Sequence, residues 1–260
     1  MTALLVIFCG IGGLLIGSFL NVVIWRVPRD ESVVRPPSHC PACDTPIAPR
    51  DNVPVLSWLL LRGRCRACRA AISVRYPLVE LATAGLFAGF AVRIGPHAAL
   101  PAFLYLAGIG VALALIDLDV QRLPDVLTLP SYPVALVLLG IAAGAEGEGW
   151  PFARGLIGMA ALFGFYATLW FIYPAGMGLG DVKLSGVLGL YLGWLSWAAL
   201  VVGAASAFLI GAVVSIAVVV VRGGNRKTKV PFGPFMLVGV LIAVFAAHPI
   251  AHAYLHSLGR

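Results

Sequence analysis

Charged side chains are scarce in this sequence. Only 11% of its 260 residues are Asp, Glu, Lys or Arg, whereas 60% are hydrophobic, and the mean hydropathy is +0.97. An average soluble domain carries about 25% charged residues, so these few charges cannot cover the surface of a water-soluble protein of this length. The scarcity excludes a soluble enzyme, a disordered chain and a secreted disulfide scaffold. It is typical of a protein that crosses a membrane several times.

The sequence also lacks the pattern of a nucleic-acid-binding protein, although its net charge is +7. Its basic residues flank apolar runs and do not alternate with aromatic residues in the manner typical of RNA binding. Orientation of the chain in a bilayer explains such flanking charges. We therefore expect contact with membrane lipid and no nucleic-acid partner.

Long apolar runs predict an all-α polytopic membrane protein of about eight transmembrane helices. A spanning helix needs about 20 mostly apolar residues. The run Leu184–Val221 is too long for one span, and we divide it into two helices near Tyr191–Trp197. The predicted spans are Ala3–Trp25, Tyr76–Ile94, Ala99–Ile116, Val126–Ala143, Gly155–Tyr173, Leu184–Gly203, Ala204–Val221 and Phe235–Leu255.

The distribution of basic residues predicts the orientation of these spans. With eight spans, the odd-numbered loops hold 15 of the 18 Lys and Arg residues, so the positive-inside rule places these loops in the cytoplasm and both termini outside. The chain then divides into a first helix (1–25), a cytoplasmic insert (26–75) and a transmembrane bundle (76–260). The odd-numbered loops are Arg26–Arg75, Asp117–Asp125, Pro174–Lys183 and Arg222–Phe232.

The insert contains two CxxC pairs, Cys40 with Cys43 and Cys65 with Cys68. Four thiolates at this spacing suit a tetrahedral zinc site, and a bound metal would stabilise an insert that has little core of its own. A redox pair or unliganded thiols are the alternative, although structural disulfides are uncommon in the reducing cytosol.

Acidic residues are rare, yet several cluster at the predicted cytoplasmic ends of spans. Asp117 ends the third span, and Asp181 follows Gly178 and Gly180 after the fifth. Ionisable groups at membrane depth are costly and usually functional. Two carboxylates held together can share one proton, so that one is an acid and the other a base toward water, which is aspartic-protease chemistry. The glycines suit a closely approached backbone.

Other polar residues near these sites have simpler interpretations. We expect Asp119 to face the polar loop and Asp125 to cap the next helix. Lys183 either anchors its helix at the membrane surface or lowers the pKa of Asp181. Glu80, at the start of the second span, could pair with Arg75.

Taken together, the motifs resemble those of the type IV prepilin peptidases, over nearly the whole chain. The similarity lies in the order and combination of the motifs. They are Gly17-Ser-Phe-Leu-Asn21 with Arg26-Val-Pro28, the four cysteines, Asn52-Val-Pro54-Val-Leu-Ser57-Trp58, Arg75-Tyr-Pro77-Leu-Val-Glu80, the Asp117 segment, and Gly178-Leu-Gly180-Asp181-Val-Lys183.

The resemblance implies two activities. One is cleavage of the basic leader from type IV prepilins and pilin-like secretion (pseudopilin) precursors at the cytoplasmic face of the bacterial inner membrane, with Asp117 and Asp181 as the catalytic pair of a GxGD-type protease. The other is transfer of a methyl group from S-adenosylmethionine to the new N-terminus. No nucleotide-binding glycine fingerprint is present, so methylation and its donor rest on the resemblance, and the donor pocket has no predicted position.

Three alternatives remain open. A peptidase without methyltransferase activity is the nearest, but the intact cysteine insert argues against it, because simpler family members lack the insert. A presenilin-like protease would share only the Gly-x-Gly-Asp element and is not expected to carry the insert. A transporter or metal-handling protein would account for the cysteines and for His248, His252 and His256, but not for the two aspartate segments.

Overall fold

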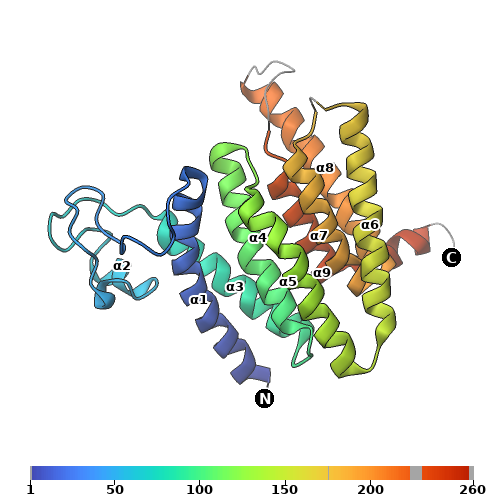
Figure 1. Ribbon diagram of the computed structural model, residues 1–260, viewed down its shortest axis with the longest axis horizontal. Helices are drawn as coiled ribbons and strands as arrows, with labels where there is room; N and C mark the ends of the chain where they lie inside the picture. Colours follow the sequence, from blue (N-terminus) through green and yellow to red (C-terminus); the bar gives the residue numbers. More distant parts are fainter. Residues whose placement is uncertain (1, 175, 223–229, 258–260) are drawn as a thin grey trace. The chain divides into compact units, whose positions relative to one another are not determined.

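The computed structural model describes residues 2–174, 176–222 and 230–257, and Figure 1 shows that these ranges are mainly helical, apart from the largely irregular insert around α2. They contain no β-strand, only two isolated β-bridges, so the all-α prediction is confirmed. The helices are α1 (Thr2–Arg26), α2 (Leu56–Leu60), α3 (Arg75–Ile94), α4 (Leu100–Val120), α5 (Asp125–Glu146), α6 (Gly149–Ile172), α7 (Leu179–Leu195), α8 (Trp197–Arg222) and α9 (Gly233–Ser257), with short 3-10 helices η1 (Val27–Arg29) and η2 (Pro49–Asp51).

Seven helices of the described chain are long and apolar enough to cross a membrane, namely α1, α3, α4, α5, α6, α8 and α9. The remaining predicted span corresponds to α7, whose 17 residues lie at the lower end of the usual spanning length of about 17–25 residues. Most of the basic loop predicted at Arg222–Phe232 falls on residues 223–229, which lie outside the described ranges.

The predicted boundary between the two helices of the Leu184–Val221 run, placed after Gly203, is wrong. The helix breaks at Ser196, inside the interval Tyr191–Trp197, where the backbone is extended. The Ser196 hydroxyl oxygen accepts a hydrogen bond of 2.9 Å from the Ala199 N–H. Serine is a preferred N-cap because its side chain satisfies an orphan N–H of the first turn, so a single polar residue starts α8.

The chain forms two compact units, residues 1–112 and 113–260. In the first, α1 packs on α3 through glycines. A Cβ at Gly13 would lie 2.7 Å from the Ala84 Cα, and a Cβ at Gly17 would lie 2.7 Å from the Glu80 Cα. Only glycine permits this approach, so Gly13 and Gly17, four residues apart, form a GxxxG motif that packs the two helices closely. Cys9 is buried in α1 as an apolar residue.

In the second unit, α7 is the central helix and packs against α5, α6, α8 and α9 (Figure 1). Every residue from Leu184 to Trp194 is buried. A helix that is apolar on all sides is stable only when other helices surround it. The first turns of α7 carry Asp181, so this packing fixes the position of that carboxylate.

Candidate functional site

The four predicted cysteines come together in the insert. Their Sγ atoms lie within 4.8 Å of one another, and those of Cys40 and Cys68 are 3.8 Å apart. Four sulfurs at about 2.3 Å from a tetrahedrally bound ion would be separated by about 3.8 Å. The cluster therefore has the dimensions needed to hold one metal ion. All the cysteines are free thiols.

Both CxxC pairs adopt the same turn. The Cys40 N–H donates to the Thr45 carbonyl at 3.0 Å, and the Cys65 N–H donates to the Ala70 carbonyl at 2.8 Å. The backbone then turns back through a left-handed residue directly after the second cysteine, at Asp44 (φ 53°) and at Arg69 (φ 64°). Repetition of one backbone geometry around two CxxC pairs that differ in their other residues indicates that both turns serve the cluster.

The environment of Cys43 favours the thiolate, which is the metal-binding form of cysteine. Its Sγ lies 3.3 Å from the Thr45 hydroxyl oxygen. Hydrogen bonds from the Thr45 side chain and backbone lower the pKa of Cys43 to about 6. Hydrogen bonds that favour a thiolate lower the pKa of its thiol.

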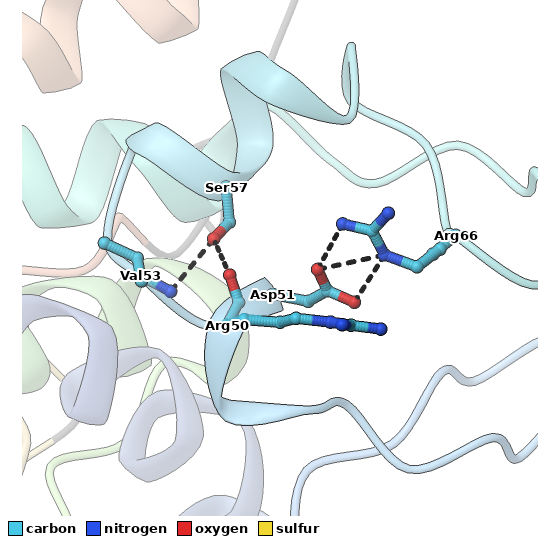
Figure 2. Close-up of polar contacts among 5 residues, drawn as sticks. All are labelled: Arg50, Asp51, Val53, Ser57 and Arg66. Atoms are coloured by element: carbon cyan, nitrogen blue, oxygen red, sulfur yellow. Dashed lines mark hydrogen bonds and ion pairs between the residues drawn. The ribbon is translucent and has the colours of Figure 1, made fainter.

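The insert is held by three further polar contacts. The Ser57 hydroxyl accepts the Val53 N–H and donates to the Arg50 carbonyl, both at 3.0 Å. Figure 2 shows these bonds beside the ion pair between Arg66 and Asp51, whose shortest N–O distance is 2.6 Å. The Arg66 hydrogen bonds lower the pKa of Asp51.

Glu80 provides a contact that the sequence did not predict. Its carboxylate is buried, with 7% of the residue exposed, and accepts a hydrogen bond of 2.7 Å from the Val55 N–H. Glu80 belongs to α3 and Val55 directly precedes α2. The side chain therefore joins the insert to a membrane-spanning helix.

Asp117 and Asp181 are both buried, with 5% and 8% of each residue exposed. Asp117 lies in the last turn of α4, and its Oδ2 atom accepts the Gly233 N–H at 3.0 Å. Gly233 begins α9, so this carboxylate satisfies one of the N–H groups that a helix N-terminus leaves without a partner.

Asp181 lies in the first turn of α7, and its Oδ2 atom accepts the Gly178 N–H at 3.2 Å. Gly178 is the N-cap of this helix and Asp181 is its third residue. A carboxylate at this position that accepts the N–H of the N-cap residue is one half of a capping box. A Cβ at Gly178 would lie 3.3 Å from the same oxygen. The glycine thus leaves room for Asp181.

Leu123 joins the surroundings of the two aspartates. A Cβ at Gly180 would lie 2.8 Å from the Leu123 Cβ, and a Cβ at Gly233 would lie 3.3 Å from the Leu123 Cδ2 and 2.8 Å from the Asp117 Oδ2. The charge of Asp117 also acts on Asp181, so the two carboxylates lie within electrostatic range. Two buried carboxylates from different helices thus face one small region.

The sequence interpretation missed several residues at this site. Gly233 and Leu123 carry no local signal of their roles. Tyr166 of α6 is only 2% exposed and is close enough to Asp181 for a charge on that carboxylate to act on the Tyr166 phenol. Its ring lies among those of Phe208, Phe232 and Phe165. Such residues become visible only when the helices are assembled.

The structure corrects one expectation about the nearby charges and adds one contact. Pro124, and not Asp125, occupies the N-cap position of α5. The Asp125 carboxylate pairs with the Lys183 Nζ at 2.7 and 2.8 Å. Lys183 therefore has a partner that the sequence interpretation did not name. Asp119 is exposed at the end of α4, as expected.

The fold and these clusters define a class of protein: a polytopic membrane protein with a four-cysteine insert and a pair of buried aspartates. Residues 11–94 match the model of the bacterial peptidase A24 N-terminal domain, and residues 102–220 match that of the type IV leader peptidase family. No solved structure matches the chain.

Relatives match over almost the whole chain. It is 39% identical to the prepilin leader peptidase/N-methyltransferase of Aeromonas hydrophila, over 93% of this chain and 91% of the relative. It is 36% identical to the protein of the same name in Pseudomonas aeruginosa, over 95% and 92%. It is also 38% identical to the type 4 prepilin-like proteins leader peptide-processing enzyme of Escherichia coli O78:H11, over 90% and 91%. The chain belongs to the prepilin leader peptidase/N-methyltransferase family.

Proposed function

We propose that this protein cleaves the leader peptide from type IV prepilins and pilin-like precursors and then methylates the new N-terminus. The observation that carries the cleavage proposal is the pair of buried carboxylates, Asp117 and Asp181, within electrostatic range of each other. The relatives are named for both activities over nearly their whole length, which supports methylation from S-adenosylmethionine.

In the proposed cleavage step, Asp117 and Asp181 share one proton. The protonated carboxylic acid donates a hydrogen bond to the scissile carbonyl oxygen, while the carboxylate removes a proton from a water molecule. The water oxygen then bonds to the carbonyl carbon, the peptide C–N bond breaks, and the leaving nitrogen takes up the proton that the carboxylate removed from the water, which returns the pair to its singly protonated state. Because the pair titrates as a unit, the two roles belong to the pair.

The contacts of each carboxylate support this proposal. Each accepts one backbone N–H from a helix start, Gly233 for Asp117 and Gly178 for Asp181. Each carboxylate therefore has one oxygen, Oδ2, engaged by the protein. Positioning by backbone groups costs no reorganisation during the reaction. The burial of both groups also strengthens their mutual influence, because screening by water is weak there.

We further propose that the metal of the insert is zinc, bound by Cys40, Cys43, Cys65 and Cys68. Four cysteine ligands leave no open coordination position, which is the arrangement of structural zinc sites. The ion would hold the two CxxC turns together and stabilise the insert. We also propose that the insert and the aspartates face the cytoplasm of a bacterium, across its inner membrane, and that both termini are external, as the basic loops predict.

Incubation of the purified protein with a prepilin and S-adenosylmethionine, followed by mass spectrometry, tests the proposed function. We expect the product to lose its leader and to gain about 14 Da, the mass of one CH₂ unit, at its new N-terminus. Cleavage without the added mass would leave a peptidase that lacks methyltransferase activity. An intact precursor under conditions in which a related enzyme cleaves it would contradict the proposal.

A further inference from the structure

The inner side of the short helix α2 is fixed to the rest of the insert. Ser57 is buried and makes the two backbone bonds shown in Figure 2. The Trp58 indole N–H donates to the Ile72 carbonyl at 3.1 Å. Gly63 packs against the same indole, because a Cβ there would lie 2.9 Å from its Cζ2. The orientation of α2 is therefore set by specific contacts.

The outer side of α2 exposes three leucines, which we call the leucine face. Leu56, Leu59 and Leu60 are 52%, 58% and 73% exposed. Positions i, i+3 and i+4 lie on one side of a helix. Single exposed apolar residues are ordinary, but a contiguous apolar patch on a fixed helix marks an interaction surface.

The connections of α2 bring the leucine face close to the membrane. Leu56 directly follows Val55, whose N–H is bonded to Glu80. Glu80 lies in the second turn of α3, a helix that begins at Arg75 and is long and apolar enough to span the bilayer. Leu56 therefore directly follows a residue that is hydrogen-bonded to the start of α3, and α3 enters the bilayer at this end.

Exposed arginines follow the leucines directly. Four of them lie within nine residues of the end of α2, whereas this segment contains no acidic residue. One of the four, Arg66, is paired with Asp51 and is still 57% exposed. Leucines beside arginines are the composition of segments that lie in the interface of an anionic membrane. The four are Arg62, Arg64, Arg66 and Arg69.

We propose that the leucine face of α2 inserts into the boundary between headgroups and acyl chains of an anionic bilayer, with the following arginines against lipid phosphates. The apolar side chains leave water, while the guanidinium groups remain at the charged surface. The insert is then held to the membrane by α2 as well as by α1 and α3. This inference concerns lipid and does not depend on the proposed reactions.

Photo-crosslinking in nanodiscs tests this inference on the full-length, metal-containing protein. A diazirine analogue of leucine is placed at Leu60, or at Ile47 as the control, since both are exposed apolar positions of the insert outside the CxxC pairs. The nanodiscs contain phosphatidylglycerol and phosphatidylcholine, and adducts are identified by mass spectrometry. We expect about fivefold more phospholipid adduct from position 60 than from position 47, because only position 60 is immersed.

Two outcomes would overturn the inference. Equal lipid adducts at positions 60 and 47 would mean that the leucine face lies in water. Adducts from position 60 to another part of the chain, to a second copy or to an added prepilin, in place of lipid, would mean that protein covers it. Nanodiscs of phosphatidylcholine alone test the arginines: we expect the lipid adduct at position 60 to fall about twofold or more, and an unchanged yield would contradict their contact with anionic lipid.

Discussion

The Val55 N–H donates a hydrogen bond of 2.7 Å to the buried carboxylate of Glu80. Val55 has φ 60° and ψ −50°, a conformation that β-branched residues rarely adopt and that costs about 1–3 kcal/mol. Such a conformation persists only where surrounding contacts determine it. Glu80 supplies one such contact and connects the insert to α3.

Replacing Glu80 with Ala should therefore loosen the insert around α2. A hydrogen bond to a charged group contributes about 1.5–3 kcal/mol. The free energy of opening measured by hydrogen exchange at the amides of residues 53–60 should fall by a similar amount, so these amides should exchange faster. Glu80→Gln retains an acceptor oxygen and should have a smaller effect. Glu31→Ala, at an exposed position of the insert, is the control. Unchanged exchange in Glu80→Ala would show that Val55 is held by other contacts.

Metal analysis of the purified protein should find one zinc ion per chain. Replacing Cys40 with Ser leaves three sulfur ligands, so zinc should be lost more readily to a chelator and the insert should become sensitive to protease. Methylation should suffer more than cleavage, because the aspartates lie on other elements. Cys9→Ser changes a cysteine outside the cluster and should retain the metal. A zinc-free protein, or one with a disulfide in each CxxC, would contradict the proposed site.

The Asp51–Arg66 pair should give the insert a specific pH dependence. Arg66 lowers the pKa of Asp51 in the folded insert. The ion pair therefore contributes its full stability when the pH is above the pKa of Asp51 in the unfolded chain, which is about 3.9. This contribution is lost as the pH falls through the lower pKa that Asp51 has in the folded insert. The difference in exchange of amides 50–66 between wild type and Asp51→Asn should be constant above about pH 5 and shrink below about pH 4.

Comparison of these two proteins removes the effect of cysteine protonation, which both share. The control is Asp44→Asn, which changes an exposed carboxylate that is not part of the Arg66–Asp51 ion pair. The effect of Asp51→Asn should be small, because Arg66 is more than half exposed and water and salt screen the pair. A difference that grows toward low pH would have the wrong sign for this account.

Alanine at Gly180 or Gly233 should impair cleavage. The new Cβ would lie 2.8 Å from the Leu123 Cβ in the first case and 2.8 Å from the Asp117 Oδ2 in the second, so a side chain must move at the aspartates. Overpacking of this kind costs about 1–3 kcal/mol. Gly164→Ala places a Cβ in open space on α6 and should cleave normally. Normal cleavage by Gly233→Ala would show that the Asp117 carboxylate can be displaced without loss of function, contrary to its assigned role.

Local patterns were enough to predict much of this molecule. Apolar runs predicted the helices, and the repeated CxxC spacing predicted the four-cysteine cluster, because both depend on neighbours in the sequence. The break at Ser196 lies in the predicted interval Tyr191–Trp197, but the span boundary predicted after Gly203 was wrong, because the serine that caps α8 stands within an apolar run. The pairing of Lys183 with Asp125, 58 residues away, and of Asp117 with Gly233, 116 residues away, depends on how the helices assemble. No periodicity contains that information.

The most direct test of the proposed catalytic pair is cleavage of a prepilin by the variants Asp117→Asn, Asp181→Asn and the double variant, measured by mass spectrometry. Asparagine nearly preserves volume but cannot share the proton, so each single change should abolish cleavage and the double change should be no worse than either. Asp119→Asn and Asp125→Asn should retain activity, and Asp117→Asn should still methylate a precleaved pilin. Substantial cleavage by Asp181→Asn, or inactivation by Asp119→Asn with Asp117→Asn active, would contradict the assignment of the pair.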